Sequence, residues 1–125
     1  MQGVNTRISG NLYSRINSNG AWADATDISS QLIANTWQYV AYTVNSQGIA
    51  VYLNGNEVGN AKSDLSACFT NNFLSKMTDA RVGSSNIWGD SDISSAKFGS
   101  VSIYNTALTD EKVEALYNQE NKLDK

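Results

Sequence analysis

The chain has 125 residues, a length typical of one domain that can bury a core of its own. Its nine Lys and Arg against twelve Asp and Glu give a net charge of −3, which argues against a nucleic acid partner because a basic surface for phosphates is missing. The absence of His and the single Cys, Cys68, exclude Ser-His-Asp and Cys-His catalytic pairs, His-ligated zinc and an internal disulfide.

The first residues, Met1–Asn5, lack the basic and apolar regions of a signal peptide. No apolar run approaches the roughly 18 residues needed to cross a membrane. If Met1 is the native start, the protein is made without a secretory signal. If Met1 is a boundary within a longer protein, we expect an extracellular or cell-surface location. The sequence leaves both options open.

Two segments near the N-terminus are predicted strands, residues 4–8 and residues 11–17. In the second, alternation places Tyr13, Arg15 and Asn17 on one face. A ring, a planar cation and an amide in a row are the groups that a glycan groove needs. A solvated outer face of a sheet would carry the same residues, so both interpretations stay open.

Trp22 lies in a polar stretch, residues 19–27, whose small neighbours would leave an indole exposed. Sugars stack their C–H faces on such rings, and Asp24 or Asp27 could accept hydrogen bonds from their hydroxyl groups. The alternative is that Trp22 covers the end of the core from the end of a strand.

Residues 37–44 are rich in aromatic and β-branched residues, which favour a strand. Both faces of this segment are apolar, and a strand of that kind is usually central and covered on both sides. We expect Trp37 to be part of the packing, because aromatic residues on strands are mostly buried.

The next segment predicts a hairpin over residues 49–58. Alternation puts Ile49, Val51 and Leu53 on one face. Asn54 and Gly55 follow directly, and both tolerate the positive φ that a type I′ turn requires.

A further strand is predicted at residues 79–83, followed by a loop at residues 84–92 that contains Trp88. This indole is a candidate ligand platform. Asp90 and Asp92 could bind Ca²⁺ together with neighbouring carbonyl groups, but their spacing lacks the Gly and Glu positions of an EF-hand. An Asp-rich turn without a metal is the alternative.

Residues 97–105 form the last predicted strand, with Val101 and Ile103 on one face and serines on the other. A short helix of about two turns is expected after Thr109. Thr109 can cap its N-terminus, and Asp110 and Glu111 place favourable negative charge on its first turn. Its apolar stripe consists of Val113, Leu116 and Tyr117. Such a short helix must dock on the sheet.

Together these elements predict an all-β fold, an antiparallel two-sheet sandwich or jelly roll with one short C-terminal helix. It forms a single domain over residues 1–120, and residues 121–125 are a flexible tail.

Four segments in this order resemble the laminin-G-like jelly rolls of the concanavalin A-like lectin/glucanase superfamily. They are residues 37–44 (WQYVAYTV), 49–58 (IAVYLNGNEV), 81–85 (RVGSS) and 98–117 (FGSVSIYNTALTDEKVEALY). The resemblance covers about residues 30–118, and the strands that precede this region in the family are short or absent here. We therefore expect an open sheet edge, closed by a second copy in a homodimer, by another chain, or by residues 1–17.

The resemblance implies several functions, because the superfamily includes lectins, carbohydrate-binding modules, glycosidases and adhesion domains. Its glycosidases carry their carboxylates on one strand, as Glu-x-Asp-x-x-Glu, and no such run occurs here. We expect a non-catalytic module that binds a poly- or oligosaccharide; the candidate residues are Tyr13, Arg15, Asn17, Trp22 and Trp88. A protein-interaction or adhesion module is the alternative, and a degenerate enzyme is a third. Members often bind calcium, which supports Ca²⁺ as the ligand of Asp90 and Asp92.

Overall fold

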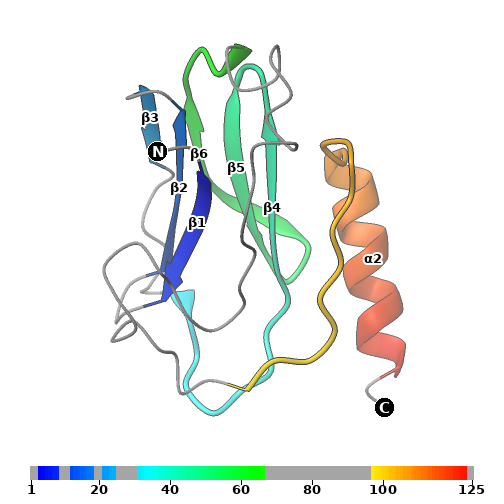
Figure 1. Cartoon of the computed structure of the whole chain (residues 1–125). Coiled ribbons are helices and arrows are strands. Elements are labelled where there is room, and N and C mark those ends of the chain that lie inside the picture. The colour runs from blue at the N-terminus through cyan, green and yellow to red at the C-terminus, as the bar shows by residue number, and fades with distance from the viewer. Residues whose placement is uncertain (1–2, 9–11, 19–20, 25–30, 67–96, 124–125) are drawn as a thin grey trace.

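The structure is a computed structural model that describes residues 3–8, 12–18, 21–24, 31–66 and 97–123. Its strands form two antiparallel three-stranded sheets, in the orders β1-β2-β3 and β4-β5-β6 (Figure 1). The elements are β1 (Gly3–Ile8), β2 (Leu12–Ser18), β3 (Ala21–Asp24), β4 (Val40–Asn45), β5 (Gly48–Leu53), β6 (Asn56–Lys62) and α2 (Asp110–Leu123).

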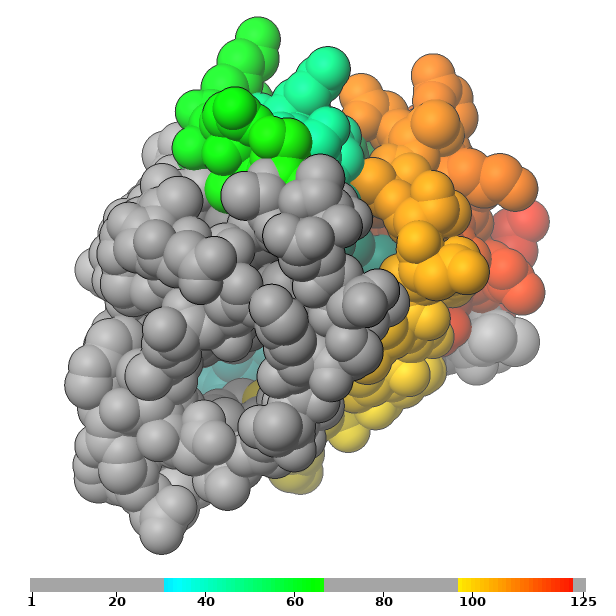
Figure 2. Space-filling view, turned by 45° about the horizontal axis from the view of Figure 1, so that its top comes forward, coloured from blue at the N-terminus to red at the C-terminus, as the bar shows by residue number. Residues whose placement is uncertain are grey.

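The second sheet lies in the middle of the arrangement. The strands β2 and β3 lie against β5 and β6 on one of its sides (Figure 1), and helix α2 lies on its other side (Figure 1 and Figure 2). The predicted antiparallel architecture with a C-terminal helix is therefore present. Jelly-roll connectivity stays a prediction, because residues 67–96 lie outside the described part of the chain.

The predicted hairpin is confirmed and forms the core. Asn54 and Gly55 have φ angles of 50° and 85°, the positive values of a type I′ turn. Ile49, Val51 and Leu53 are buried together with Leu65. The three residues that alternate along β5 thus face the interior, as expected for the apolar face of a strand.

The first sheet is built by residues that the sequence analysis placed outside the family resemblance. The predicted strands at residues 4–8 and 11–17 are confirmed as β1 and β2, and β3 follows them unpredicted. The sequence analysis offered a second copy, another chain or residues 1–17 to close an open sheet edge. The described backbone supports the third option, because the N-terminal strands lie against the second sheet.

The predicted strand at residues 37–44 differs from the structure in its bounds and in the packing of Trp37, whereas its central position stays a prediction because residues 67–96 lie outside the described part of the chain. Only β4 (Val40–Asn45) is a strand, and within the described sheet it pairs with β5 alone. Trp37 is 66% exposed instead of packed. The reason is the hairpin turn: the last β4–β5 pair is Val40 with Leu53, so Trp37 lies beyond the end of the ladder.

The predicted strand at residues 97–105 was also wrong. These residues adopt no strand, and among the described strands none pairs with them. Ile103 is 88% exposed, whereas Val51 is 1% exposed. Trp37 and Ile103 therefore do not share the interior in which Val51 is buried.

Helix α2 begins as predicted but is longer. The Lys112 backbone N–H donates to Thr109 Oγ1 over 3.3 Å, which confirms Thr109 as the cap. The helix has 14 residues and continues through 121–123, which the sequence analysis assigned to the tail. Tyr117, near the middle of the helix, contacts the hairpin turn, and such tertiary contacts stabilise a helix that would fray in isolation.

Two predictions fall outside the described residues, the strand at residues 79–83 and the loop at residues 84–92, and Cys68 lies outside them as well.

Candidate functional site

The register of the first sheet brings four of the predicted binding residues to one face. Asn17 is opposite Trp22 in the β2–β3 pair. Directly opposite residues of antiparallel strands lie on the same face. Trp22 therefore joins the face that Tyr13, Arg15 and Asn17 share by alternation, a connection that its position in the polar stretch 19–27 did not indicate.

The neighbouring strand positions extend this face. Arg7 is opposite Tyr13 and Asn5 is opposite Arg15 in the β1–β2 pair, and Asp24 is opposite Arg15 in the β2–β3 pair. We call this set the β1–β3 polar face; it comprises Asn5, Arg7, Tyr13, Arg15, Asn17, Trp22 and Asp24. It combines two aromatic residues with amide, guanidinium and carboxylate groups.

The other face of the same sheet has the opposite composition. Its positions are Val4, Thr6, Ile8, Leu12, Ser14, Ile16, Ser18, Ala21 and Ala23, of which six are apolar and three carry a hydroxyl group. A sheet with one apolar and one polar face buries the apolar one and leaves the polar one for solvent or a ligand. The composition of the two faces therefore favours the β1–β3 polar face as the ligand side.

The length of the polar face indicates the size of a matching ligand. Tyr13 and Trp22 lie at opposite ends of the β2 register, four strand positions apart because Trp22 pairs with Asn17. At about 3.4 Å per residue they are separated by about 14 Å along the strand. That distance exceeds one sugar ring, so two stacking positions so placed match an oligosaccharide.

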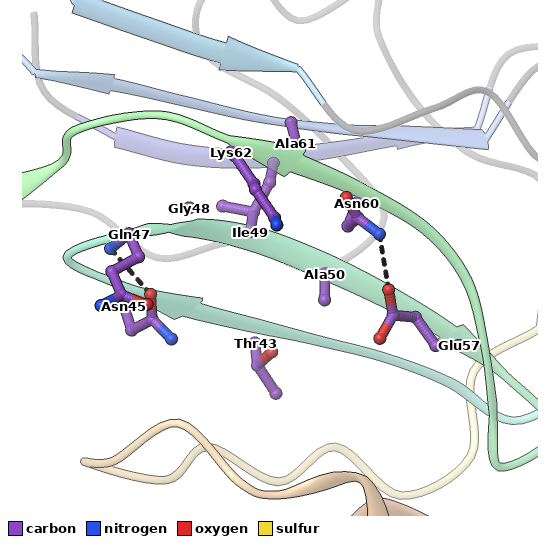
Figure 3. A pocket seen from close by; sticks show the side chains of 10 residues that line it. All are labelled: Thr43, Asn45, Gln47, Gly48, Ile49, Ala50, Glu57, Asn60, Ala61 and Lys62. Atoms are coloured by element: carbon purple, nitrogen blue, oxygen red, sulfur yellow. Dashed lines mark hydrogen bonds between the residues drawn. The ribbon is translucent and has the colours of Figure 1, made fainter.

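A second polar site, which the sequence analysis missed, lies on the side of the second sheet that also carries α2. It is an open groove of about 210 Å³, and we call it the outer groove (Figure 3). Its floor is formed by Gly48 and Ala50. Its polar side chains are Thr43, Asn45, Gln47, Glu57, Asn60 and Lys62.

A β-bulge gives the outer groove its central pair of side chains. Glu57 and Asn60 are three residues apart, so strict alternation would put them on opposite faces of β6. The β5–β6 register shifts between Val51 and Tyr52, which makes Glu57 the partner of Tyr52 and Asn60 the partner of Ala50. Both then lie on one face, and Asn60 Nδ2 donates a 2.7 Å hydrogen bond to Glu57 Oε1 (Figure 3).

Tyr52 marks the border between the outer groove and helix α2. Its hydroxyl group donates a 2.6 Å hydrogen bond to Asp110 Oδ1 at the start of the helix. Burial, followed by the hydrogen bond to the Asp110 carboxylate, raises the pKa of Tyr52 to about 12.

The middle of α2 lies over the hairpin turn beyond Tyr52. A Cβ added to Gly55 would lie 2.9 Å from Tyr117 Cδ1, and the rings of Tyr39 and Tyr117 are 6.0 Å apart. The helix therefore covers the turn end of this face, and the outer groove occupies the other end.

The remaining predicted site residues, Trp88, Asp90 and Asp92, lie outside the described residues, and the calcium prediction stays untested. Among the residues that the structure describes, no cluster of three His, Cys, Asp or Glu side chains could hold a metal ion. In the same part of the chain, no helix has the length and apolar character needed to cross a membrane.

Comparison with known families gives a match to most of the chain. The Laminin_G_3 model, described as the concanavalin A-like lectin/glucanases superfamily, matches residues 3–114. This confirms the family resemblance and corrects its extent, because the match begins at β1 and not near residue 30. The superfamily fold is a β-sandwich, in agreement with the antiparallel sheets described above.

A comparison with solved structures found a similar fold in a bacterial protein. The crystal structure of residues 221–444 of an S-layer domain-containing protein from Clostridium thermocellum has a TM-score of 0.58 and 18% sequence identity. The similarity covers 87% of this chain and 52% of that chain, so this chain spans about half of the matched structure. At this identity the likeness shows the fold alone. No curated protein matches the chain.

Proposed function

This chain belongs to the concanavalin A-like lectin/glucanase superfamily, and on that premise we propose that it is a non-catalytic carbohydrate-binding module. The ligand is a poly- or oligosaccharide bound on the β1–β3 polar face. The observation that carries the proposal is the strand register, which places Tyr13, Arg15, Asn17 and Trp22 on one face of one sheet.

The chemistry of this face supports a saccharide. Tyr13 and Trp22 offer rings for the apolar faces of sugars, and Asn17, Arg15 and Asp24 offer donors and acceptors for hydroxyl groups. Arg15 and Asp24 occupy paired positions, and Arg7 leaves the face with one excess positive charge. A face of this composition suits a polyhydroxylated chain better than a nucleic acid, in line with the net charge of −3.

The proposal of a non-catalytic role rests on the carboxylates. Glycoside hydrolysis needs two carboxyl groups on either side of one bond, about 5 to 9.5 Å apart. The four Glu residues occupy positions 57, 111, 114 and 120, and none lies in the strand motif that the glycosidases of the superfamily use. Asp24 is the only carboxylate on the β1–β3 polar face as defined above, where a hydrolase would need a pair.

A cell-surface or extracellular location is part of the proposal. The family and the fold shared with an S-layer domain-containing protein both support a surface or adhesion module. Such a module would hold its parent protein on a polysaccharide of the cell surface.

A protein-interaction module is the second candidate, and exposed apolar side chains favour it. Ile33, Trp37, Phe98, Val101 and Ile103 are all exposed. A Cβ on Gly99 would lie 3.7 Å from the Trp37 ring, so the segment at residues 97–103 passes beside Trp37. Exposed apolar side chains beside one another, as at Trp37 and the segment containing Gly99, are a feature of protein interfaces.

Two tryptophan variants separate these functions. We expect Trp22→Ala to lower the affinity for the matching glycan at least about tenfold, the loss typical of a central aromatic anchor. The matched control, Trp37→Ala, should leave glycan affinity unchanged. Affinity electrophoresis in gels containing soluble polysaccharides would measure both, with and without Ca²⁺ because Asp90 and Asp92 are candidate ligands.

The opposite result would favour the second candidate. If no polysaccharide retards the wild-type protein, or if Trp22→Ala binds as the wild type does, the proposed carbohydrate site is wrong. If Trp37→Ala instead abolishes association with a protein partner, the chain is an interaction module.

A further inference from the structure

We propose that the outer groove is a second saccharide-binding site, for a neutral sugar, so that the domain holds two glycan segments on opposite sides. The part concerning the groove stands on its own geometry. The part concerning two segments rests on the proposed function of the β1–β3 polar face.

The outer groove is the open part of an otherwise covered sheet face. Helix α2 covers the end of this face at Tyr52 and Gly55, through the bond from Tyr52 to Asp110 and the approach of Tyr117 to Gly55. The strands extend beyond the helix, and their outer positions there are polar.

The β-bulge is the main reason to regard the groove as a binding site. Bulges that place a chosen side chain on a given face are common beside functional sites. Here the bulge brings Glu57 and Asn60 to the same face, where they form their 2.7 Å hydrogen bond (Figure 3). The second Glu57 oxygen and the Asn60 carbonyl oxygen remain as acceptors for neighbouring sugar hydroxyls.

The opposite rim of the groove supplies donors. The Gln47 backbone N–H donates a 2.8 Å hydrogen bond to Asn45 Oδ1. This bond occupies the Asn45 oxygen and leaves its Nδ2 group as a donor, as Figure 3 shows at the mouth of the groove. Between the two rims lie Gly48 and Ala50, whose small size lets a flat ring approach the β5 backbone.

The charges of the lining select a neutral ligand. Glu57 and Lys62 compensate each other, and the other polar side chains are amides and a hydroxyl group. An anion would require an excess of Lys or Arg, and a bound metal ion would require a cluster of carboxylates. At about 210 Å³ the groove is smaller than the roughly 300–1,000 Å³ of sites for drug-sized ligands, which fits one sugar ring of a longer chain.

The two sites lie on opposite sides of the sheets. Ala50, Thr43 and Asn60 project into the groove, whereas the side chains of Ile49 and Ala61 project toward the first sheet (Figure 3). Two layers about 10 Å apart therefore separate the outer groove from the β1–β3 polar face. One sugar ring cannot reach both sites, so simultaneous binding joins two chains or two distant parts of one polymer.

The test uses the intact chain with galactomannan, hydroxyethylcellulose and xylan as neutral polymers and their hexasaccharides as single-site ligands. Isothermal titration with the hexasaccharide that binds gives the stoichiometry, and light scattering with the polymer reports cross-linking. The groove variants are Asn60→Ala, which removes a hydrogen-bonding side chain, and Ala50→Leu, which fills the floor. Asn118→Ala changes an exposed Asn on α2 and serves as the control.

We expect two hexasaccharides per wild-type chain and cross-linking of the polymer. Asn60→Ala and Ala50→Leu should each reduce the stoichiometry to one, abolish cross-linking and lower the apparent polymer affinity by about 10²-fold, because the second binding event is lost. Trp22→Ala should do the same through the other face, and Asn118→Ala should behave as the wild type.

Several outcomes would overturn the inference. In one outcome, the wild type binds one hexasaccharide, loses that binding in Trp22→Ala and keeps it in both groove variants. This result would agree with the proposed function and contradict the outer groove as a binding site. If the groove variants change the stoichiometry and Trp22→Ala does not, the result supports the outer groove and contradicts the proposed site on the β1–β3 polar face. Binding of an unstructured peptide in the groove in place of any sugar would also overturn it.

Discussion

The hairpin at residues 48–62 and the segment at residues 97–105 have the same sequence pattern but differ in the burial of their apolar side chains. Both alternate between apolar and small or polar residues. In the hairpin, Ile49 and Val51 are buried, whereas Val101 and Ile103 in the later segment are exposed. The hydrophobicity of the residues does not explain the difference, because each pair consists of one Val and one Ile.

The difference lies in the partners of the two segments. β5 pairs with β4 on one side and β6 on the other, so its apolar face is held against a neighbouring layer. Among the described strands, none pairs with residues 97–105. Alternation therefore indicates which residues share a face, but the neighbouring backbone determines whether that face is covered.

The sharpest way to test the comparison is to shorten the same residue in both segments. Ile49→Ala should lower the free energy of unfolding by about 2–5 kcal/mol, because it leaves a cavity in the core. Ile103→Ala should change it by less than about 0.5 kcal/mol, as for other exposed positions. Urea unfolding followed by tryptophan fluorescence would measure both. Equal losses would mean that residues 97–105 are buried in solution.

A glycine in each segment gives the second test. Gly48 has a φ of 149°, and a Cβ there would lie 2.1 Å from the Ala61 carbonyl oxygen. Gly48→Ala should therefore cost about 2–4 kcal/mol, since the positive φ and the close backbone approach are each worth about 1–3 kcal/mol.

Gly99 is the matched control, because among the described residues the nearest atom to its added Cβ would be in the Trp37 ring, at 3.7 Å. Gly99→Ala should be neutral or stabilising by up to about 1 kcal/mol, through the lower entropy of the unfolded chain. Thermal unfolding distinguishes the two variants. A strongly destabilising Gly99→Ala would show that its backbone is more constrained than the structure indicates.

A tyrosine pair gives the third and smallest effect. Tyr52→Phe should lower stability at neutral pH by about 1.5–3 kcal/mol, because it removes a buried hydrogen bond to a carboxylate. Tyr104→Phe, at a half-exposed position in the other segment, should have almost no effect. Comparable losses would contradict the distinction between the two segments.

The same tyrosine predicts a pH dependence. The pKa of Tyr52 is about 12 in the folded protein, compared with about 10 in an unfolded chain. Between these values the unfolded chain releases the proton and the folded protein keeps it, so ionisation favours unfolding. The stabilisation is complete below pH 10 and is lost as the pH rises toward 12. In Tyr52→Phe this component should be absent.

Much of the local structure could be predicted from the sequence. The Asn54-Gly55 turn, the strands at residues 4–8 and 11–17, and the Thr109 cap depend on neighbouring residues, which are visible in the chain. Helix length was not predicted, because residues 121–123 carry no stop signal or apolar stripe that distinguishes a last helical turn from a tail. The exposure of Trp37 could not be predicted either, because it depends on where the β4–β5 pairing ends, at Val40 and Leu53.

Only part of the candidate site could be predicted from the sequence. Alternation grouped Tyr13, Arg15 and Asn17, but the addition of Trp22 depends on its pairing with Asn17 across a turn. The outer groove was missed because alternation separates Glu57 from Asn60, and only the shifted β5–β6 register brings them together. A bulge leaves little signal in one sequence, because it arises from the match between two strands.

The sequence by itself determined the Asn54-Gly55 turn, the Thr109 cap, the faces of β2 and β5 and the superfamily. The tertiary structure decided which of those faces are covered, where the ladders end and which polar residues meet across strands. The physical reason is that φ and ψ preferences and alternation act within a few residues. Burial and cross-strand pairing depend on backbone that is distant in the chain and comes close only when the sheets assemble.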